Sequence, residues 1–129
     1  MDEFSLAVGR TFCWHEVYTA DVPATIKFYT ECLGWEHGEM EMAEGTYHMF
    51  KNHGQSICGI FDVAHANGAP PHWAVYTAVD DVDARLAKCQ AAGAIVVHGP
   101  MDIPTIGRMV LIKDPQGAMI WLYQPEMPG

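Results

Sequence analysis

Basic residues are scarce in this sequence. Its 129 residues include 7 lysines and arginines against 16 aspartates and glutamates, which gives a formal net charge of −9. Nucleic acids and anionic membranes are bound by clustered positive charge that neutralises phosphate groups. The few lysines and arginines stand singly along the chain, so we expect neither nucleic acid nor a membrane surface as a partner.

Long apolar runs are also missing. The longest one, Ala91–Val97, falls far short of the roughly 20 residues that a bilayer-spanning helix needs. Residues 1–12 carry two acids where a secretory signal would have a basic start. We therefore expect a cytoplasmic protein.

Cysteine is sparse, and the spacing of the cysteines matches no metal-binding or redox motif. The four cysteines are Cys13, Cys32, Cys58 and Cys89. None belongs to a Cys-x-x-Cys pair, so neither a zinc knuckle nor a thioredoxin-type redox site is indicated. We interpret them as small buried hydrophobic residues in a reducing compartment.

The sequence does contain an internal repeat. Two similar segments lie 60 residues apart: Asp21-Val22-Pro23-Ala24 and Asp81-Val82-Asp83-Ala84. Apolar residues with helical spacing i, i+4, i+7 define each segment, which predicts an amphipathic helix on a core. These residues are Val22, Ile26 and Tyr29 in the first half and Val82, Leu86 and Cys89 in the second. Asp21 and Asp81 suit N-caps, and Gly34 and Gly93 suit helix ends.

Strand-like runs surround both predicted helices. A run rich in aromatic and β-branched residues precedes each helix, and shorter extended runs separated by Gly and Asp follow it. The predicted strands are 11–18, 35–42, 46–50 and 55–61 in the first half, and 72–79, 94–98, 109–113 and 118–123 in the second. Each half therefore has the order strand, helix, strand, strand, strand, and the sequence predicts an α+β domain built from two tandem βαβββ modules.

The organisation of the single domain 1–129 follows from this repeat. Module one covers about 11–61 and module two about 72–123. A linker with one glycine and two prolines occupies 62–71, and a loose tail occupies 124–129. Because about 50 residues bury too little apolar surface to fold alone, the modules must share a core or pair with another chain.

Several short motifs in this order resemble a known family. They are Trp14–Asp21, Phe28-Tyr29, Leu33-Gly34-Trp35, His72-Trp73, Val79–Asp83, Gly107-Arg108 and Asp114–Ala118. The doubled module with these motifs, from residue 11 to 123, is similar to the vicinal oxygen chelate superfamily. That group includes glyoxalase I, bleomycin resistance proteins, fosfomycin resistance enzymes, methylmalonyl-CoA epimerase and extradiol dioxygenases. The resemblance implies curved mixed sheets around a concave cavity, often completed by a homodimer.

The resemblance also implies where a divalent metal would bind. Metal-dependent members hold the ion with His or Glu on the first and last strands of each module, and the ion acts as a Lewis acid on substrate oxygens. Those positions fall here on Trp14, Ala74, Trp121 and either Cys58 or Gly59. Indole and methyl groups cannot bind a metal, and one thiolate suits a hard cation poorly. We therefore expect no metal ligand at the family positions and favour no cofactor, with a divalent metal elsewhere as the alternative.

Alternation along the strands predicts which residues line the cavity. Successive strand side chains point to opposite faces. The predicted lining is Trp14, Glu16, Tyr18, His72, Tyr76, Trp121 and Tyr123, while Cys13, His15, Val17 and Trp73 face a helix. Aromatic walls with a few polar anchors are the usual composition of a small-molecule site.

Glu16 and His72 admit three interpretations. They can form a displaced metal site, although they supply fewer protein ligands than the three usual for a catalytic zinc. They can act as a base and its complementary acid, because an aromatic environment raises the pKa of a carboxyl group. Alternatively, Glu16 pairs with His72 or with an arginine and has no catalytic role. Arg108 can likewise bind a ligand carboxylate or phosphate, or pair with nearby acids.

The remaining histidines show no spacing typical of metal ligands. His37, His48, His53, His65 and His98 lie in or beside predicted turns and short strands. We interpret each of them as a solvated imidazole.

Two classes of function remain. The favoured one is a glyoxalase/bleomycin resistance-like protein that binds a small aromatic or oxygen-rich molecule between its aromatic side chains, without the usual metal. The alternative is a lyase, epimerase or dioxygenase that uses Glu16 and His72. In both cases we expect a homodimer whose ligand contacts are Trp14, Tyr18, Tyr76, Trp121, Tyr123 and Arg108.

Overall fold

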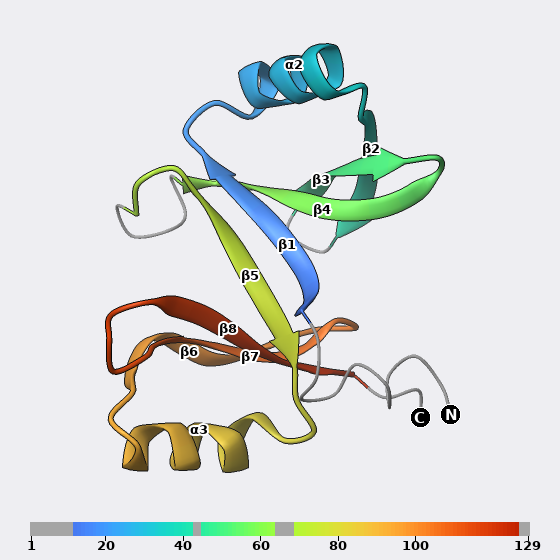
Figure 1. The fold of residues 1–129 in the computed structure, drawn as a ribbon. Helices are drawn as coiled ribbons and strands as arrows, with labels where there is room; N and C mark the ends of the chain where they lie inside the picture. The colour runs from blue at the N-terminus through green and yellow to red at the C-terminus, as the bar shows by residue number, and fades with distance from the viewer. Residues whose placement is uncertain (1–11, 43–44, 64–68, 127–129) are drawn as a thin grey trace. The chain divides into compact units, whose positions relative to one another are not determined.

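The computed structural model describes residues 12–42, 45–63 and 69–126, and these divide into two compact units (Figure 1). The N-terminal unit holds the described part of 14–74. The C-terminal unit holds 75–126 together with Phe12 and Cys13. Each unit has one helix on one side of its strands.

The N-terminal unit is built from four strands and a helix. These elements are β1 (Phe12–Thr19), α2 (Val22–Leu33), β2 (Glu36–Met42), β3 (Gly45–Asn52) and β4 (Gln55–Asp62). The strands lie in the order β2-β3-β4-β1. β1 pairs with β4 in parallel, with Glu16 opposite Gly59, and the other two pairings are antiparallel.

The C-terminal unit repeats this plan. Its elements are β5 (His72–Ala78), which starts in the N-terminal unit, α3 (Val82–Ala91), β6 (Ile95–Ile103), β7 (Gly107–Lys113) and β8 (Met119–Pro125). The strand order is β5-β8-β7-β6. β5 and β8 are parallel, with Tyr76 opposite Trp121, and the others are antiparallel. The predicted α+β fold with two βαβββ modules is confirmed.

Both helices begin as the repeat predicts. Oδ1 of Asp21 accepts a hydrogen bond from the Ala24 amide at 3.0 Å, and Asp81 caps α3 through Ala84 at the same distance. Gly34 ends α2 in the left-handed conformation (φ 72°), which costs glycine little. None of the helices in the described ranges has the length and apolar character to cross a bilayer.

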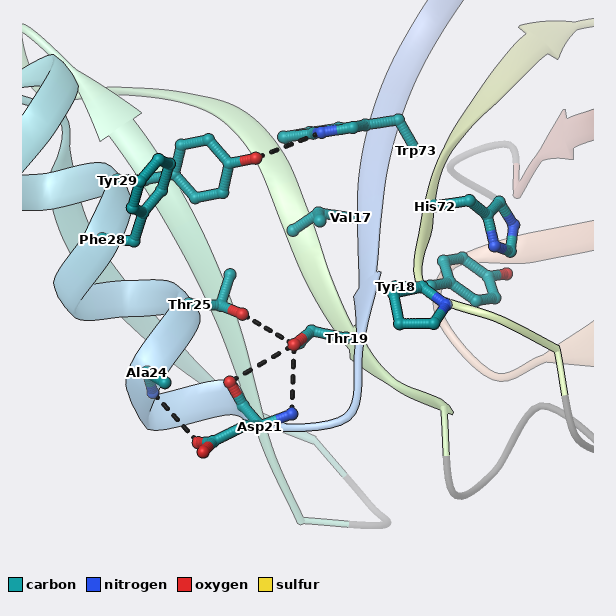
Figure 2. Close-up of a pocket in the computed structure, with 11 residues that line it drawn as sticks. Val17, Tyr18, Thr19, Asp21, Ala24, Thr25, Phe28, Tyr29, His72 and Trp73 are labelled. Atoms are coloured by element: carbon teal, nitrogen blue, oxygen red, sulfur yellow. Dashed lines mark hydrogen bonds between the residues drawn. The ribbon is translucent and has the colours of Figure 1, made fainter.

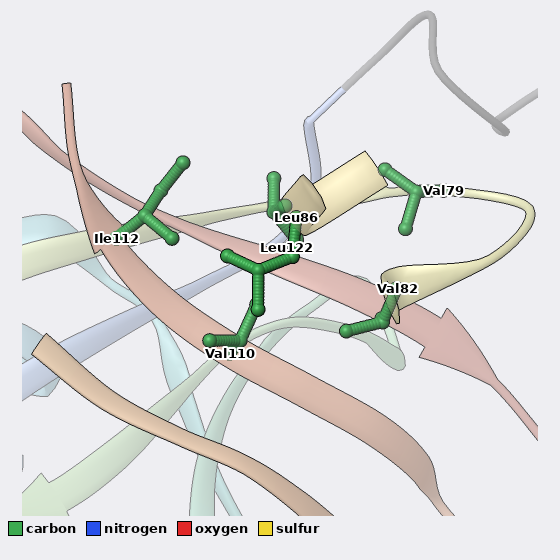
Figure 3. Packing of buried hydrophobic residues seen from close by; sticks show 6 residues of the cluster. All are labelled: Val79, Val82, Leu86, Val110, Ile112 and Leu122. Carbon is green, nitrogen blue, oxygen red and sulfur yellow. The ribbon is translucent and has the colours of Figure 1, made fainter. Parts of the chain in front are cut away.

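Each unit buries the apolar stripe of its helix. Val82 and Leu86 of α3 pack on Val110, Ile112 and Leu122 (Figure 3). In the N-terminal unit, α2 covers a cluster of β-strand residues with Val22, Ile26 and Tyr29; the cluster consists of Val17, Phe50, Cys58 and Ile60. Removal of this apolar surface from water stabilises both units.

Two predicted boundaries are wrong in the described residues. β6 does not end at His98 but continues to Ile103, because register shifts around His98 accommodate the Gly99-Pro100 step within the strand. The loose tail starts too early in the prediction. β8 runs to Pro125, and the Gln124 side chain accepts a hydrogen bond from the Val82 amide at 2.9 Å. Residues 127–129 and the linker residues 64–68 lie outside the described ranges.

Candidate functional site

The two faces of the N-terminal sheet carry different side chains. Val17 and Cys58 belong to the cluster under α2. Their strand neighbours Glu16 and Gly59 therefore point to the opposite face, where they lie side by side in the β1–β4 pairing. This is the face that the alternation pattern assigns to ligand binding.

A hydrogen-bonded chain of three side chains lies on this face. The Tyr47 hydroxyl donates to Oε2 of Glu16 at 2.6 Å and accepts from Nε1 of Trp14 at 3.2 Å. Glu16 is only 6% exposed. Burial, the Glu16 charge and the hydrogen bond to Glu16 all raise the pKa of Tyr47 far above its ordinary value. The phenol therefore stays protonated and remains a donor to the carboxylate.

Gly59 leaves the space that the hydrogen-bonded side chains of Tyr47 and Glu16 occupy. A Cβ at this position would collide with the Tyr47 hydroxyl and lie 3.0 Å from Oε2 of Glu16. Glycine is thus the residue that permits Tyr47 to reach over β4.

Strand register settles which residue of β4 matches Trp121. Gly59 lies opposite Glu16, and Trp121 lies opposite Tyr76. Since Glu16 and Tyr76 are 60 residues apart and equivalent in the repeat, Gly59 and Trp121 are equivalent as well. The sequence left open whether Cys58 or Gly59 occupies the metal-ligand position on the last strand of module one. The register assigns this position to Gly59.

The residues at the family's metal positions do not fit a divalent ion. Trp14, Ala74, Gly59 and Trp121 provide no carboxylate, imidazole or thiolate. At Gly59 the space is already filled by Tyr47 and Glu16. We therefore derive no chemical step through a metal at these positions.

His72 is held by the backbone of its own segment. Its Nδ1 lies 2.6 Å from the carbonyl oxygen of Pro70, and its ring contacts that of Tyr18 with centroids 4.5 Å apart. A carbonyl oxygen can only accept, so Nδ1 carries the hydrogen. In the neutral imidazole Nε2 is then a proton acceptor.

The C-terminal unit supplies an aromatic stack. Tyr76 and Trp121 are parallel to within 8°, with centroids 5.3 Å apart, and His98 meets the edge of Trp121 at 6.2 Å. The Tyr123 hydroxyl donates to the Ile106 carbonyl at 2.8 Å, and burial raises its pKa. The register position that holds Glu16 and Gly59 in one unit thus holds two stacked rings in the other.

Arg108 pairs with acidic side chains. Its guanidinium binds both carboxylate oxygens of Asp83 at 3.1 Å and one oxygen of Asp102 at 3.1 Å. Pairing with nearby acids, one of the two roles predicted for Arg108, is thus present in the structure.

A pocket that the sequence did not indicate opens beside α2 (Figure 2). It has a volume of about 460 Å³, with Phe28, Tyr29 and Trp73 among its walls. Trp73 Nε1 donates to the Tyr29 hydroxyl at 3.3 Å, and the Thr25 hydroxyl donates to that of Thr19 at 2.6 Å. The first of these hydrogen bonds holds the middle of α2 and the second holds its start. Tyr18 and His72 of the predicted lining also belong to this pocket. Figure 2 shows the Trp73 indole on the α2 side of β1 and the rings of Tyr18 and His72 on the other side of that strand.

A second cluster was also missed. His37 and Glu39 of β2 and His48 of β3 bring three metal-binding atoms together. The prediction that His37 and His48 lack ligand spacing is wrong, because the two strands pair with Glu39 opposite His48. Recognition of 36–52 as one hairpin would have revealed the cluster.

Comparison with known proteins gives a clear family match. The family model for the Glyoxalase/Bleomycin resistance protein/Dioxygenase superfamily matches residues 11–122. The Mycobacterium tuberculosis protein "Putative glyoxylase CFP32" is 38% identical over 115 residues, which are 89% of this chain and 44% of that protein. Anthracycline biosynthesis protein DnrV of Streptomyces peucetius is 31% identical over 125 residues, which are 86% of this chain and 46% of that protein. The chain thus spans less than half the length of these relatives.

Solved structures match the fold. Methylmalonyl-CoA epimerase from Mycobacterium tuberculosis superposes with a TM-score of 0.62 at 17% identity, covering 90% of this chain and 88% of the epimerase. A hypothetical protein from Bacillus halodurans C-125 gives a TM-score of 0.65 at 8% identity, covering 92% and 96%. At these identities the likeness concerns the fold alone.

Proposed function

The chain belongs to the Glyoxalase/Bleomycin resistance protein/Dioxygenase superfamily, and from this premise we propose that it binds a small aromatic, oxygen-bearing organic molecule without a metal at the family positions. The predicted membership of the vicinal oxygen chelate superfamily is confirmed. Trp14, Tyr18, Tyr76, Trp121, Tyr123 and Arg108 stay the predicted ligand contacts, and a homodimer stays the predicted assembly.

The observation that carries this proposal is the chain from Trp14 through Tyr47 to Glu16. The Tyr47 hydroxyl donates a hydrogen bond to Glu16 and accepts one from Trp14. These two bonds fix the orientation of the Tyr47 ring and of the Glu16 carboxylate. Trp14 is only partly buried and offers an aromatic surface for stacking. An aromatic wall beside an oriented carboxylate favours a planar ligand that bears a hydroxyl or an N–H group.

The relatives support an aromatic ligand. DnrV and DauV of Streptomyces both bear the name anthracycline biosynthesis protein, and anthracyclines are planar polycyclic compounds with hydroxyl and carbonyl groups. Such a molecule combines the flat ring surface and the hydrogen-bond donors that Trp14 and Glu16 would recognise.

A ligand titration without metal tests the proposal. The probe is 1,4-dihydroxyanthraquinone, added in the presence of EDTA, and the readouts are the melting temperature and tryptophan fluorescence. Saturating probe should stabilise the protein, by about 2.7 kcal/mol at one hundred times Kd. Trp14→Ala should lose this effect. Trp73→Phe, which alters an indole on the α2 side, is the matched control and should keep it.

Two results would overturn this function. One is a lack of stabilisation by the anthraquinone and by other planar aromatic probes. The other is equal loss of binding in Trp14→Ala and Trp73→Phe, which would mean that the probe binds outside the proposed face.

A second candidate function, acid–base catalysis, is favoured by the state of Glu16 and His72. A buried carboxylate and an imidazole with Nε2 as acceptor can each take a proton from a carbon next to a carbonyl group, and the protonated partner can return one. Exchange of that hydrogen for deuterium in D₂O, followed by NMR on the thiol adduct of a 2-oxoaldehyde, tests this reaction. Exchange that disappears in Glu16→Gln and in His72→Gln would support an enzyme of the lyase or epimerase type.

A further inference from the structure

Three side chains on the outer hairpin of the N-terminal unit form a compact group. His37 and Glu39 are two residues apart on β2, and His48 lies opposite Glu39 on β3. Nε2 of His37 is 2.9 Å from Nδ1 of His48, and Oε1 of Glu39 is 4.0 Å and 3.9 Å from these two nitrogens. Two imidazoles and one carboxylate thus converge on one point.

This group lies on the opposite face from Glu16 and Tyr47. His48 follows Tyr47 in β3, so the two side chains point to opposite faces. His37 pairs in register with Phe50, whose side chain packs in the cluster under α2. The group is therefore on the α2 face, separate from the proposed ligand face and from the family's metal positions.

The chemistry of the three groups suits a borderline transition metal. Imidazole with carboxylate is a typical ligand set for Zn²⁺, Ni²⁺, Co²⁺ and Cu²⁺, and three protein ligands with water complete a tetrahedral zinc site. Neighbouring ligand atoms of a tetrahedral ion with bonds of about 2.0–2.1 Å are about 3.4 Å apart. The observed separations of 2.9, 3.9 and 4.0 Å lie on both sides of this value. Small side-chain rotations would make them equal.

The hairpin pre-orients these ligands. β2 and β3 pair without interruption from Glu36 opposite Lys51 to Met42 opposite Gly45. The rings of His37 and His48 are stacked, with centroids 5.1 Å apart and an angle of 22°. The three side chains are 29%, 55% and 31% exposed in chain order, so an ion can reach them from solvent. Little backbone reorganisation is needed for binding.

The local charge also favours a cation. β2 carries Glu36, Glu39 and Glu41 within six residues, and the whole chain has a net charge of −9. Glu41 accepts a hydrogen bond from the Thr46 hydroxyl at 2.9 Å, two pairs further along the ladder. The Glu36 carboxylate accepts from the Gly54 amide at 3.1 Å. Glu41 shares the face of His37 and Glu39 and adds negative potential there, whereas Glu36 lies on the other face of β2, opposite Lys51.

We propose that His37, Glu39 and His48 bind one divalent transition-metal ion, of which Zn²⁺ is the reference case, and that the ion fastens β2 to β3. Nε2 of His37, Nδ1 of His48 and Oε1 of Glu39 are the ligand atoms, and water fills the open position. The competing interpretation is a plain hydrogen-bonded histidine pair.

Metal titration of the stripped chain tests this site. Zn²⁺ is titrated against a chromogenic indicator, and Co²⁺ against visible absorption, which reports its coordination geometry. We expect one ion per chain and Co²⁺ bands typical of low coordination number. Zn²⁺ should also raise the melting temperature, because an ion that binds only the folded state stabilises it.

Variants assign the binding to these residues. His48→Gln and Glu39→Gln should each weaken Zn²⁺ binding at least tenfold, with circular dichroism to verify folding. His53→Asn is the matched control, because His53 is a turn imidazole with φ 52° that asparagine tolerates; its affinity should equal that of the wild type. Glu16→Gln should also bind Zn²⁺ normally.

Three results would overturn the proposal. They are a lack of stoichiometric binding, equal loss in the His53→Asn control, and loss in Glu16→Gln with retention in His48→Gln. The last result would place the ion on the proposed ligand face instead. Failure of the anthraquinone titration would leave this site untouched, so the two proposals fail independently.

Discussion

The Tyr47 hydroxyl and Oε2 of Glu16 are 2.6 Å apart, although β4 lies between the strands that carry them. Their hydrogen bond passes over Gly59, the residue of β4 that pairs with Glu16. The missing side chain at Gly59 leaves the space in which this bond forms.

Gly59→Ala should therefore destabilise the protein. The new methyl group collides with the Tyr47 hydroxyl, and overpacking of this kind costs about 1–3 kcal/mol. Urea unfolding followed by fluorescence measures the loss. Gly38→Ala is the control, because its methyl group would approach the flexible end of Lys51 at 2.7 Å and would make an ordinary contact with Cγ of Met49 at 3.4 Å. An equal loss in both variants would show that the contact with Tyr47 is not the cause.

Tyr47→Phe should lower the free energy of unfolding, and the loss should be larger at neutral pH than at alkaline pH. It removes the donor to a buried carboxylate, at a cost of about 1–3 kcal/mol. The folded state raises the pKa of Tyr47, so the stabilisation is complete below the ordinary tyrosine pKa of about 10 and is lost as pH rises above it. Urea unfolding at a series of pH values should show a steeper alkaline decline in the wild type than in Tyr47→Phe.

Phenol absorbance at 295 nm gives an independent check of this pKa. While the protein is folded, Tyr47 should not ionise near pH 10. The wild type and Tyr47→Phe should then gain the same absorbance between pH 9 and 11. One additional titrating phenol in the wild type would contradict the assignment.

Asp21→Ala and Asp81→Ala should have similar effects. Each removes the acceptor for an amide at the start of a helix, and loss of such a cap costs about 1 kcal/mol. Chemical denaturation measures both values. Asp21→Ser and Asp81→Ser keep a capping oxygen and should recover most of the stability; if serine is as costly as alanine, the cap is not the reason.

The cysteines should differ in reactivity. Cys32 is exposed, whereas Cys58 is buried and burial raises its pKa to about 11. Because the thiolate is the nucleophile, a disulfide reagent at pH 8 should modify Cys32 much faster than Cys58. Cys32→Ser should abolish the fast phase and Cys58→Ser should leave it unchanged. A fast phase that depends on Cys58 would contradict its burial under α2.

The fold could be predicted from the sequence because the repeated features are local in sequence. The caps Asp21 and Asp81, the apolar stripes and the helix stop at Gly34 depend on residues within one or two turns. β6 was predicted too short because a Gly-Pro step normally ends a strand, and only the register with β7 reveals the bulges that absorb it.

The candidate sites depend on pairing between distant strands. Alternation along β1 placed Trp14 and Glu16 on one face, but it could not find Tyr47, which is 31 residues away from Glu16. The choice between Cys58 and Gly59 likewise needed the register of β1 with β4. His37 and His48 are 11 residues apart in sequence, and the antiparallel register of β2 with β3 is what makes them neighbours.

The acidic outer strand has a consequence for self-association. β2 stands at the edge of the N-terminal sheet, and an exposed edge can pair with the same edge of another molecule. Glu36, Glu39 and Glu41 place three carboxylates on this edge strand, and we expect the repulsion between like charges to disfavour pairing of two such edges.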